Sequence, residues 1–493
     1  MFRYSIKANL KNSMRKSLLI FTLSAVGCLP VLSIAQAETS VASTAITDEV
    51  FKLLQDNHVS STSPQKLNDD AVKGMIAGLN DPYTVYFTPT EWTGFESSLE
   101  QNYVGIGVRL NSDAQGVYIT EIFKGSPAES AGVKIGDYIA GVDGKTTKNL
   151  SVDKLIDSVL GEENTNVTIT VTRNNKKIDL TMPRKRINLP VVTSKQFADG
   201  TGYIQLTSFS SDADELFAAQ LKELRKKQIH SLIIDLRNNG GGLLDTASNI
   251  AKLFIKEGVL IHTNDRNHVD TPVKLQGGAS VDFPVYVLVN ENSASASEVL
   301  TGALQDYKIA TVIGTQSYGK GSVQSIFPLS NGGMLKVTIE EYLTSLNHKV
   351  NKVGITPDIE AFGSVPQLIT ALQIAGMKDI KLTHDKNEIA VNQQVFSGEY
   401  FSIKTLKKQI YVPSRILAAM IQGKITWNAT TKTVEISAAN KKAVFPVSAN
   451  GTPKGTLFED GATYLDLASF SQKFPQLQWS MEKDLLTLQV KGN

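Results

Sequence analysis

The sequence has 493 residues, of which 41% are hydrophobic, so it encodes several folded domains and excludes a short peptide or a disordered tail. Its 50 Lys and Arg against 48 Asp and Glu leave a formal net charge of +2, which provides no broad basic surface for nucleic acid. The single cysteine, Cys28, excludes an internal disulfide, and six scattered histidines give no argument for a metal site.

Residues 1–37 have the pattern of a signal peptide. A basic stretch precedes an apolar run at 18–32, and the small-x-small sequence AQA follows at 35–37. A glycine and a proline interrupt the apolar run, which makes it a poor permanent membrane span. We predict cleavage after Ala37, with lipid attachment at Cys28 and an uncleaved anchor as alternatives. All three place the rest of the chain outside the cytoplasm.

Four further segments follow in chain order, and together they predict a multidomain α+β protein. Residues 38–100 carry apolar residues at helical spacing. Residues 101–187 contain short strands and two helical stretches, which indicates a compact β-rich domain. Residues 188–370 alternate buried strands with helices, as is typical of an α/β domain. Residues 378–493 contain a weak internal repeat, each half having a helix-like stretch, a tryptophan and a strand.

A serine-rich junction between a strand and a helix is the first candidate for chemistry. The sequence SASASE at 293–298 follows the buried strand PVYVLVN. Small side chains let a substrate carbonyl approach the backbone, and the helix N-terminus supplies N–H groups for a developing oxyanion. A helix cap, with Ser295 as N-cap and Glu298 three residues on, explains the same pattern. Both interpretations stay open from this motif alone.

The glycine-rich sequence GTQSYGKG at 314–321 is the second candidate. It nearly matches the phosphate loop GxxxxGK[ST], but Gly321 replaces the required hydroxyl residue and a strand pattern follows in place of a helix. Flanking glycines allow tight packing around Lys320, and burial favours a neutral amine. A neutral lysine can take a proton from a serine, with Gln324 to orient it. A surface lysine in a glycine-rich turn is the alternative.

Together these motifs resemble the C-terminal processing peptidases, serine proteases with a Ser-Lys active site. The matching sequences lie in order across residues 80–360 and include DPYTVYF, GSPAESAGVKIGDYIAGVDG, IIDLRNNGGGLL, NENSASASEVLTGALQD and GTQSYGKGSVQ. The resemblance implies that Ser295 is the nucleophile, that Lys320 is the general base and that Gln324 orients the amine. The fold that it implies for 188–370 is an α/β protease core.

The resemblance also places an oxyanion hole on backbone N–H groups. These belong to Ala296 and to a glycine of NNGGG, for which Gly241 is the best match. The acidic residue eleven positions after the family's serine falls on Asp306, where we expect a structural role. The resemblance implies neither a cofactor nor a metal.

Residues 101–187 resemble the PDZ domain that this family carries before its catalytic core. In such domains a glycine-rich loop presents N–H groups to a C-terminal carboxylate, and the peptide adds as a strand. The matching substrate-binding residues are Gly105, Ile106, Gly107 and Val108. Many relatives have Arg-Gly near the end of the second PDZ helix where this sequence has Leu160 before the glycine, which puts coupling between docking and activation in question.

Residues 378–493 lie outside the family pattern. They resemble tandem repeats named after the N-terminal domain of copper amine oxidases, which occur in secreted and wall-associated proteins. His384 is the single histidine in this stretch, so we expect no copper. We expect the repeat pair to bury its own core around Trp427 and Trp479, so that its removal leaves the protease folded.

The sequence is therefore interpreted as a secreted or membrane-attached serine endopeptidase that recognises substrate C-termini through its PDZ domain. The alternative is a catalytically silent extracellular PDZ-containing binding protein. The expected partners are proteins or peptides with free C-termini. Attachment to the cell wall or membrane and a homodimer are candidate associations, and nucleic acid is not expected.

Overall fold

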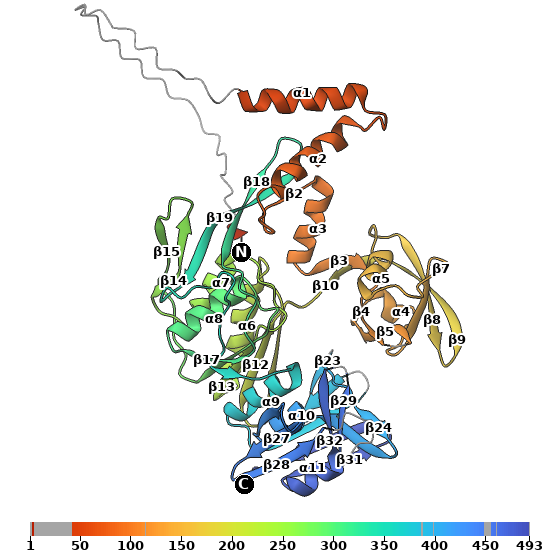
Figure 1. The fold of residues 1–493 in the computed structure, drawn as a ribbon, viewed down its shortest axis with the longest axis vertical. Coiled ribbons are helices and arrows are strands. Elements are labelled where there is room, and N and C mark those ends of the chain that lie inside the picture. The colour runs from red at the N-terminus through yellow and green to blue at the C-terminus, as the bar shows by residue number, and fades with distance from the viewer. Residues whose placement is uncertain are drawn as a thin grey trace, which may run out of the picture. The chain divides into compact units, whose positions relative to one another are not determined.

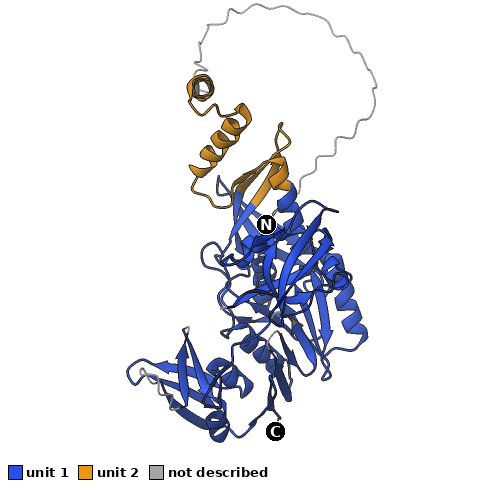
Figure 2. Ribbon diagram, turned by 90° about the vertical axis from the view of Figure 1, so that its right-hand side faces the viewer, with its two compact units in different colours: residues 1–2, 93–323, 339–493 blue, residues 3–92, 324–338 orange. Residues whose placement is uncertain are grey.

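The computed structural model describes residues 2–3 and 42–493, apart from 114, 386–387, 398, 448–454, 460 and 493. The predicted cleavage site and Cys28 lie outside the described residues. Within the described part of the chain, no helix is long and apolar enough to cross a membrane. The chain forms two compact units, one of residues 1–2, 93–323 and 339–493, the other of 3–92 and 324–338 (Figure 2).

The smaller unit is helical at its N-terminal end, as the pattern in 38–100 predicted. Its helices are α1 (Ala42–Asn57) and α2 (Pro64–Ala77), and α2 begins after Ser63, whose hydroxyl accepts the Lys66 N–H. β2 (Val85–Phe87) pairs antiparallel with residues 334–336. Three elements run on into the larger unit: α3 (Pro89–Leu99), β18 (Ser322–Pro328) and β19 (Met334–Thr344).

A small β domain occupies residues 102–188 of the larger unit (Figure 1). Its main sheet has the order β4-β5-β6-β8-β9, with β7 beside β6, so β4 lies at an edge. A separate ribbon of β3 and β10 joins the two ends of the domain. The elements are β3 (Asn102–Gly105), β4 (Val108–Asp113), β5 (Gly116–Ile122), α4 (Pro127–Ser130), β6 (Tyr138–Val142), β7 (Lys145–Thr146), α5 (Val152–Val159), β8 (Asn166–Arg173), β9 (Lys176–Pro183) and β10 (Lys185–Asn188).

The α/β core of the larger unit is built on a sheet of order β11-β12-β13-β16-β17-β20, in which only the β11–β12 pair is antiparallel. The alternation of strands and helices in 188–370 predicted this class of fold. Its elements are β11 (Val192–Gln196), β12 (Thr201–Leu206), α6 (Ala213–Lys226), β13 (Ser231–Asp235), α7 (Leu244–Ala251), β16 (Val285–Val289), α8 (Ala296–Asp306), β17 (Ala310–Gly314), β20 (Ile359–Glu360) and α9 (Ser364–Ile374). A second sheet pairs β14 (Gly258–Asp265) with β15 (Asp270–Leu275) and with residues 340–344 of β19.

Both faces of the sheet that contains β13 are buried, which explains the continuous apolar sequence of this strand. Leu232 and Ile234 point into a core shared with α6, α7 and α8, whereas Ile233 between them points into a core shared with α9. Successive side chains of a strand face opposite sides, so a strand covered on both faces must be apolar throughout. The carboxyl ends of these parallel strands lead into the loops that carry both chemical motifs.

The tail after α9 contains the same order of elements twice, a strand, a short helix and a two-stranded hairpin. The first copy is β25 (Gln409–Pro413), α10 (Ser414–Met420), β26 (Lys424–Asn428) and β27 (Thr433–Ala438). The second copy is β30 (Ala462–Asp466), α11 (Leu467–Lys473), β31 (Leu477–Glu482) and β32 (Leu485–Val490). The remaining strands are β21 (Ile380–His384), β22 (Glu388–Val391), β23 (Gln394–Ser397), β24 (Lys404–Leu406), β28 (Lys441–Pro446) and β29 (Thr456–Glu459). The likeness to copper amine oxidase repeats stays a prediction.

The expectation that this tail buries a core of its own around its tryptophans is wrong. Trp427 is 54% exposed, and Trp479 packs at the margin of the core. The tail and the α/β sheet instead share one hydrophobic cluster, in which Phe396 of β23 meets Tyr203 edge-on at 5.3 Å and stacks with Phe197 at 6.3 Å between ring centroids. Because this cluster contains side chains from both the tail and the α/β sheet, we expect the two to unfold together.

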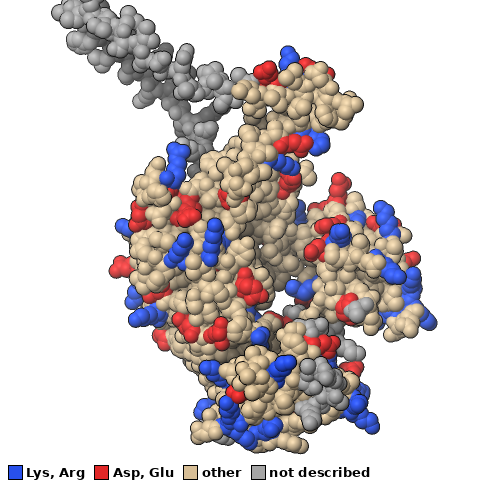
Figure 3. Space-filling view, viewed as in Figure 1, with Lys and Arg blue, Asp and Glu red and all other residues tan. Residues whose placement is uncertain are grey.

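Charges of both signs are mixed over the face of the molecule drawn in Figure 3. This distribution accords with the formal net charge of +2 for the whole sequence. A protein that tracks nucleic acid concentrates Lys and Arg along one groove or face. The expectation that nucleic acid is not a partner stays a prediction.

We predict that Phe396→Ala destabilises the whole larger unit. Truncating a buried phenylalanine removes burial and leaves a cavity, at a cost of about 3 kcal/mol in the free energy of unfolding. The matched control is Phe458→Ala, in the same tail, because that ring is 62% exposed. Chemical denaturation should show a single shifted transition for the first variant and no shift beyond about 0.5 kcal/mol for the second. A separate, early transition of the tail alone would contradict the shared core.

Candidate active site

Ser295 lies at the turn between β16 and α8, directly before the first residue of the helix. Its backbone has φ 58° and ψ −114°, a conformation that residues with a side chain seldom adopt. Such strained positions persist only where the surroundings over-determine them, and they gather at functional sites. The residue is fully buried among protein atoms. The strand-to-helix junction predicted from SASASE is therefore confirmed.

Gly241 packs directly against this turn. Its φ is +102°, and a Cβ at this position would lie 2.8 Å from Ala294 O, 2.8 Å from Ser295 Cβ and 2.9 Å from Ala296 N. Glycine is required on both grounds, since a side chain has neither the space nor the backbone freedom. The middle glycine of NNGGG thus lies beside Ala296, the other residue that the resemblance assigns to the oxyanion hole, and beside Ser295.

Asn239 connects the NNGGG loop to the turn at Ser295, and no sequence motif had marked this residue for a role. Its carbonyl oxygen accepts bonds from Ala294 N–H at 3.0 Å and Ser297 Oγ at 2.8 Å. Its side-chain oxygen accepts the Gly241 N–H at 2.9 Å, so in this structure that N–H already has a partner. α8 begins at Ala296, and the first N–H groups of a helix have no acceptor within the helix. The Ala296 N–H is therefore the donor that the helix start presents beside Ser295.

Glu298 joins the serine turn to the lysine loop. Its carboxylate accepts the backbone N–H groups of Ser295 at 2.8 Å, Gly319 at 2.6 Å and Lys320 at 2.8 Å, and the Ser317 hydroxyl at 2.6 Å. The side chain is 1% exposed. Burial raises the pKa of the Glu298 carboxyl, while these four hydrogen bonds act in the opposite direction. The capping interpretation of SASASE is confirmed, and the capping carboxylate also binds the lysine loop, while the chemical interpretation stays a prediction.

Tyr342 of β19 supports the same two residues from another side. Its hydroxyl lies 3.0 Å from the carbonyl oxygen of Lys320 and 3.3 Å from that of Ser295, and its ring is 1% exposed. Two groups, one carboxylate and one phenol, thus bind the main chain of both Ser295 and Lys320. Nothing in the sequence around Tyr342 marks it for this position, since it reads as one more residue of an alternating strand.

The lysine loop is closely packed, as its glycines predicted. Gly321 has no room for a side chain, because a Cβ there would lie 2.3 Å from the main-chain nitrogen of Asn351. Lys320 is half-buried, and its role as the general base stays a prediction beside the alternative of a surface lysine in this turn. A strand, β18, follows the loop and not the helix that a phosphate loop requires.

Two further predicted residues, Gln324 and Asp306, have contacts of their own. Gln324 belongs to the smaller unit, where it is fully buried and its amide nitrogen lies 3.4 Å from Thr338 Oγ1. Asp306 ends α8, where its carboxylate accepts the Ser345 hydroxyl at 2.9 Å and the Leu346 N–H at 2.8 Å. The contacts of Asp306 are those of a residue that holds a turn.

The predicted peptide-binding residues line a groove in the small β domain. The groove has a volume of about 620 Å³ and lies beside β4 and α5. Gly105, Ile106, Gly107 and Val108 all line it, together with Leu160. Gly107 has φ +80°, and a Cβ there would lie 2.4 Å from Ser126 Cβ. Because β4 is an edge strand, its free side can pair with an added peptide strand.

Of the described residues, no three His, Cys, Asp or Glu side chains are grouped so that they could hold a metal ion. His384 is buried in the tail against the ring of Phe401, with 4.1 Å between ring centroids. Burial lowers the pKa of His384. Its surroundings are apolar and aromatic, which is the environment of a core histidine.

Comparison with known proteins identifies three segments of the chain. Residues 200–361 match the model of peptidase family S41, residues 94–172 match the PDZ domain, and residues 32–90 match the N-terminal domain of the activating protease CtpB. The PDZ match overlaps the predicted segment 101–187. The match at residues 32–90 covers most of the segment predicted as helical.

Individual relatives extend the likeness beyond the catalytic segment. A probable CtpA-like serine protease of Staphylococcus aureus strain MRSA252 is 32% identical over 397 residues, which cover 78% of this chain and 79% of the relative. The same protein of strain bovine RF122 is 35% identical over 346 residues, 69% of each chain. Among solved structures, the photosystem II D1 C-terminal processing protease aligns over 66% of this chain and 94% of its own, with 26% identity and a TM-score of 0.43.

We predict that Gly241→Ala and Gly240→Ala differ sharply although the glycines are neighbours. The first variant forces a Cβ into Ala294, Ser295 and Ala296 at a positive φ, and it should lose about 2–4 kcal/mol of unfolding free energy. A Cβ on Gly240 meets no atom within 4 Å, so that variant should stay within about 0.5 kcal/mol of the parent. Equal stabilities in chemical denaturation would contradict this packing.

Proposed function

The chain belongs to peptidase family S41, as a CtpA-like C-terminal processing serine protease with a PDZ domain, and we propose that it cleaves peptide bonds with a Ser295–Lys320 dyad. The resemblance of its motifs to this family is confirmed by the relatives that it matches. One observation carries the proposal for the dyad. The buried carboxylate of Glu298 and the hydroxyl of Tyr342 each bind the main chain of both residues, so the two loops are held together.

The proposed reaction begins with the transfer of a proton. The neutral amine of Lys320 takes the proton of Ser295 Oγ as this oxygen attacks the carbonyl carbon of the scissile bond. The resulting ammonium then gives the proton to the leaving amine, and the C–N bond breaks to leave an acyl ester on Ser295. Water, deprotonated by the same lysine, then attacks the acyl carbon. The bond between this carbon and Ser295 Oγ breaks, the lysine ammonium returns the proton to Oγ, and the acid is released.

The negative charge that develops on the carbonyl oxygen requires fixed donors. We assign this role to the N–H groups of Ala296 and Gly241, which flank the Ser295 turn. The Gly241 N–H donates to Asn239 Oδ1 in the absence of substrate, so it must share or exchange that bond when the oxyanion forms. We assign Gln324 the role of orienting the lysine amine, which rests on the motif alone.

We propose that the enzyme acts outside the cytoplasm, as a secreted or membrane-attached endopeptidase. The basic and apolar sequence before AQA at 35–37 supports this location. The alternative of a catalytically silent PDZ-containing binding protein is not favoured, since the family to which the chain belongs consists of serine proteases. Recovery of the protein from the medium or the washed membranes of an expressing bacterium tests the location. Peptidase activity of the recovered protein tests the alternative of a silent binding protein.

We predict that Ser295→Ala and Lys320→Ala each remove peptidase activity, and that the double variant is no worse. When two residues act as one unit, the losses of rate from mutating each do not add, and a general base raises the rate about 10²–10⁴-fold. The control is Lys349→Ala, which removes an exposed lysine from the same unit and should keep full activity. Cleavage of a chromogenic peptide is measured for the parent and for all four variants. Activity of Lys320→Ala within about 10-fold of the parent would overturn the assignment.

We also propose that the groove beside β4 selects substrates by a free C-terminal carboxylate. Charge-assisted hydrogen bonds from backbone N–H groups to a carboxylate are worth about 1.5–3 kcal/mol. Amidation of the peptide terminus should therefore weaken binding about 10- to 100-fold. Leu160 stands where many relatives have arginine, so we expect docking to concentrate the substrate without switching the active site on.

A matched pair of peptides, one with a free and one with an amidated terminus, tests this groove. We expect the free-acid peptide to have the lower KM and both peptides to have the same kcat. Gly107→Ala, whose Cβ would strike Ser126, should abolish the difference, while Gly116→Ala, where a Cβ meets no atom within 4 Å, should retain much of it. Equal KM values on the parent enzyme would exclude recognition of the carboxylate.

A further inference from the structure

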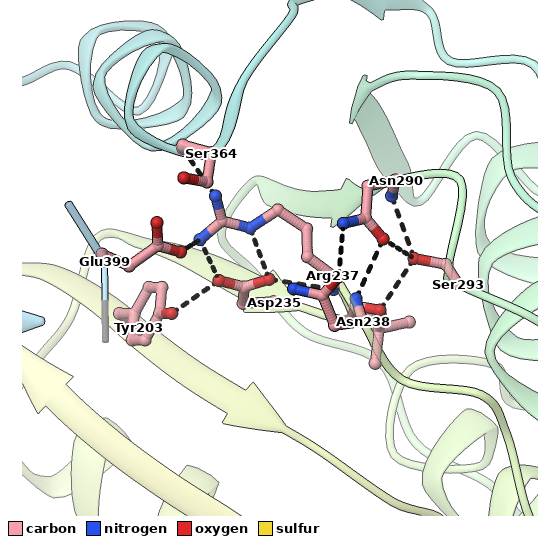
Figure 4. Close-up of polar contacts among 9 residues, drawn as sticks. Tyr203, Asp235, Arg237, Asn238, Asn290, Ser293, Ser364 and Glu399 are labelled. Carbon is pink, nitrogen blue, oxygen red and sulfur yellow. Dashed lines mark hydrogen bonds and ion pairs between the residues drawn. The ribbon is translucent and has the colours of Figure 1, made fainter. Parts of the chain in front are cut away.

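A buried ion-pair network joins the C-terminal tail to the loop beside the nucleophile. Figure 4 shows the guanidinium of Arg237 between Asp235 on its own strand end, Glu399 of the tail and the main chain of Ser364 at the start of α9. Arg237 Nε lies 2.9 Å from Asp235 Oδ1, and its Nη2 lies 3.2 Å from Glu399 Oε1. The side chain of Arg237 is 3% exposed, that of Asp235 0% and that of Glu399 20%.

The network is saturated on the side of the protease core. The Tyr203 hydroxyl donates to Asp235 Oδ2 at 2.6 Å, and the Arg237 Nη1 donates to the Ser364 carbonyl at 2.6 Å. Burial alone would lower the pKa of Arg237, but its carboxylate partners outweigh burial and raise it. One guanidinium thus has donors directed at three elements of the chain, and Glu399 is the partner that the tail supplies.

The main chain of Arg237 leads directly into the loop of Asn238 and Asn239. Asn238 N–H donates to Asn290 Oδ1 at 2.9 Å, and Asn290 Nδ2 donates back to Asn238 Oδ1 at 2.9 Å. Asn239 holds the Gly241 N–H and the Ala294 N–H. A displacement of Arg237 therefore reaches the glycine and the serine turn through consecutive hydrogen-bonded residues.

We propose that Glu399 is a positioning residue for the oxyanion hole, through which the C-terminal tail sets the catalytic rate of this protease. The proposal rests on the proposed function, because it assumes that Gly241 and Ala296 stabilise the oxyanion. Glu399 touches no substrate. It fixes the third side of the Arg237 guanidinium, and Arg237 fixes the direction in which the chain enters the loop that carries Gly241. Loss of the carboxylate leaves Arg237 paired with Asp235, so the fold persists while the loop gains freedom.

The test compares Glu399→Gln with Glu435→Gln in the full-length protein. Glu435 is a matched control, since it also pairs with a cation in the tail, Lys442 at 2.7 Å, and its side chain is 23% exposed. Initial rates with one peptide substrate give kcat and KM, and the burst of an activated ester counts the active sites. Binding of a peptide aldehyde, which forms a tetrahedral oxyanion on the serine, reports on the oxyanion hole itself.

For Glu399→Gln we expect kcat per active site to fall about 5- to 30-fold, with KM within about 2-fold of the parent. The affinity for the peptide aldehyde should fall by the same factor as kcat. Glu435→Gln should change neither. Glu399→Asp keeps the charge on a shorter side chain, so it should recover most of the loss, and it provides the comparison if Glu399→Gln does not fold.

Three outcomes would overturn the inference. The first is a kcat per active site in Glu399→Gln within about 2-fold of the parent. The second is a fall in the number of titrated sites with an unchanged rate per site, which describes a residue needed only for stability. The third is an equal loss in Glu435→Gln. Failure of the proposed function is distinguishable, since the parent itself would then show no cleavage that depends on Ser295.

Discussion

The buried carboxylate of Glu298 is the interaction on which the site depends. A carboxylate without water must be satisfied by donors, and here four donors come from two loops that are more than twenty residues apart in the sequence. Withdrawing the lysine loop would remove three of the four donors from the buried carboxylate, which is a costly state. Because these hydrogen bonds are costly to lose, the Glu298 carboxylate fixes the main chain of Ser295 relative to that of Lys320. The Tyr342 hydroxyl makes a second connection by hydrogen bonds to the carbonyl groups of the same two residues.

The α/β sheet lies between two hydrophobic cores, one shared with α6, α7 and α8 and the other shared with α9 and the tail. β13 has side chains on two faces, so Ile234 packs with the helices that precede and follow the site, while Ile233 packs with α9 and the tail. Asp235 and Arg237 follow at the end of the same strand, where the chain turns toward Gly241. The end of one strand thus contacts both the tail, through Arg237 and Glu399, and the loop that leads to Gly241, and our proposal for Glu399 rests on this arrangement. This arrangement explains why a segment outside the catalytic motifs can still belong to the enzyme.

The PDZ groove follows a different principle from the catalytic junction. The groups that we propose to bind the peptide are main-chain groups on an edge strand, and glycine is needed at 107 because Ser126 occupies the space of a side chain. Backbone recognition of a terminal carboxylate tolerates many substrate sequences, since the carboxylate is common to all C-termini. In the function that we propose, selection of the terminus in the groove and cutting by the dyad are separate tasks on separate domains.

The sequence by itself determined the local chemistry of this protein. The glycines beside Lys320 predicted a closely packed loop, and SASASE predicted a junction between a strand and a helix; the structure has both. The periodicities predicted the helices of the smaller unit, the β-rich domain and the α/β core, because hydrophobic spacing is a local property. The repeated layout of the tail was visible for the same reason.

Only the tertiary structure decided which distant residues serve these turns. Glu298 was visible as a helix cap, but its bonds to the lysine loop depend on how two strand ends come together. Tyr342 and Asn239 had no signal at all, since a strand tyrosine and a loop asparagine are common. The tail was expected to fold around Trp427, yet its core is shared with Tyr203 and its carboxylate Glu399 reaches Arg237. Contacts between residues far apart in the chain depend on packing, and no local pattern encodes them.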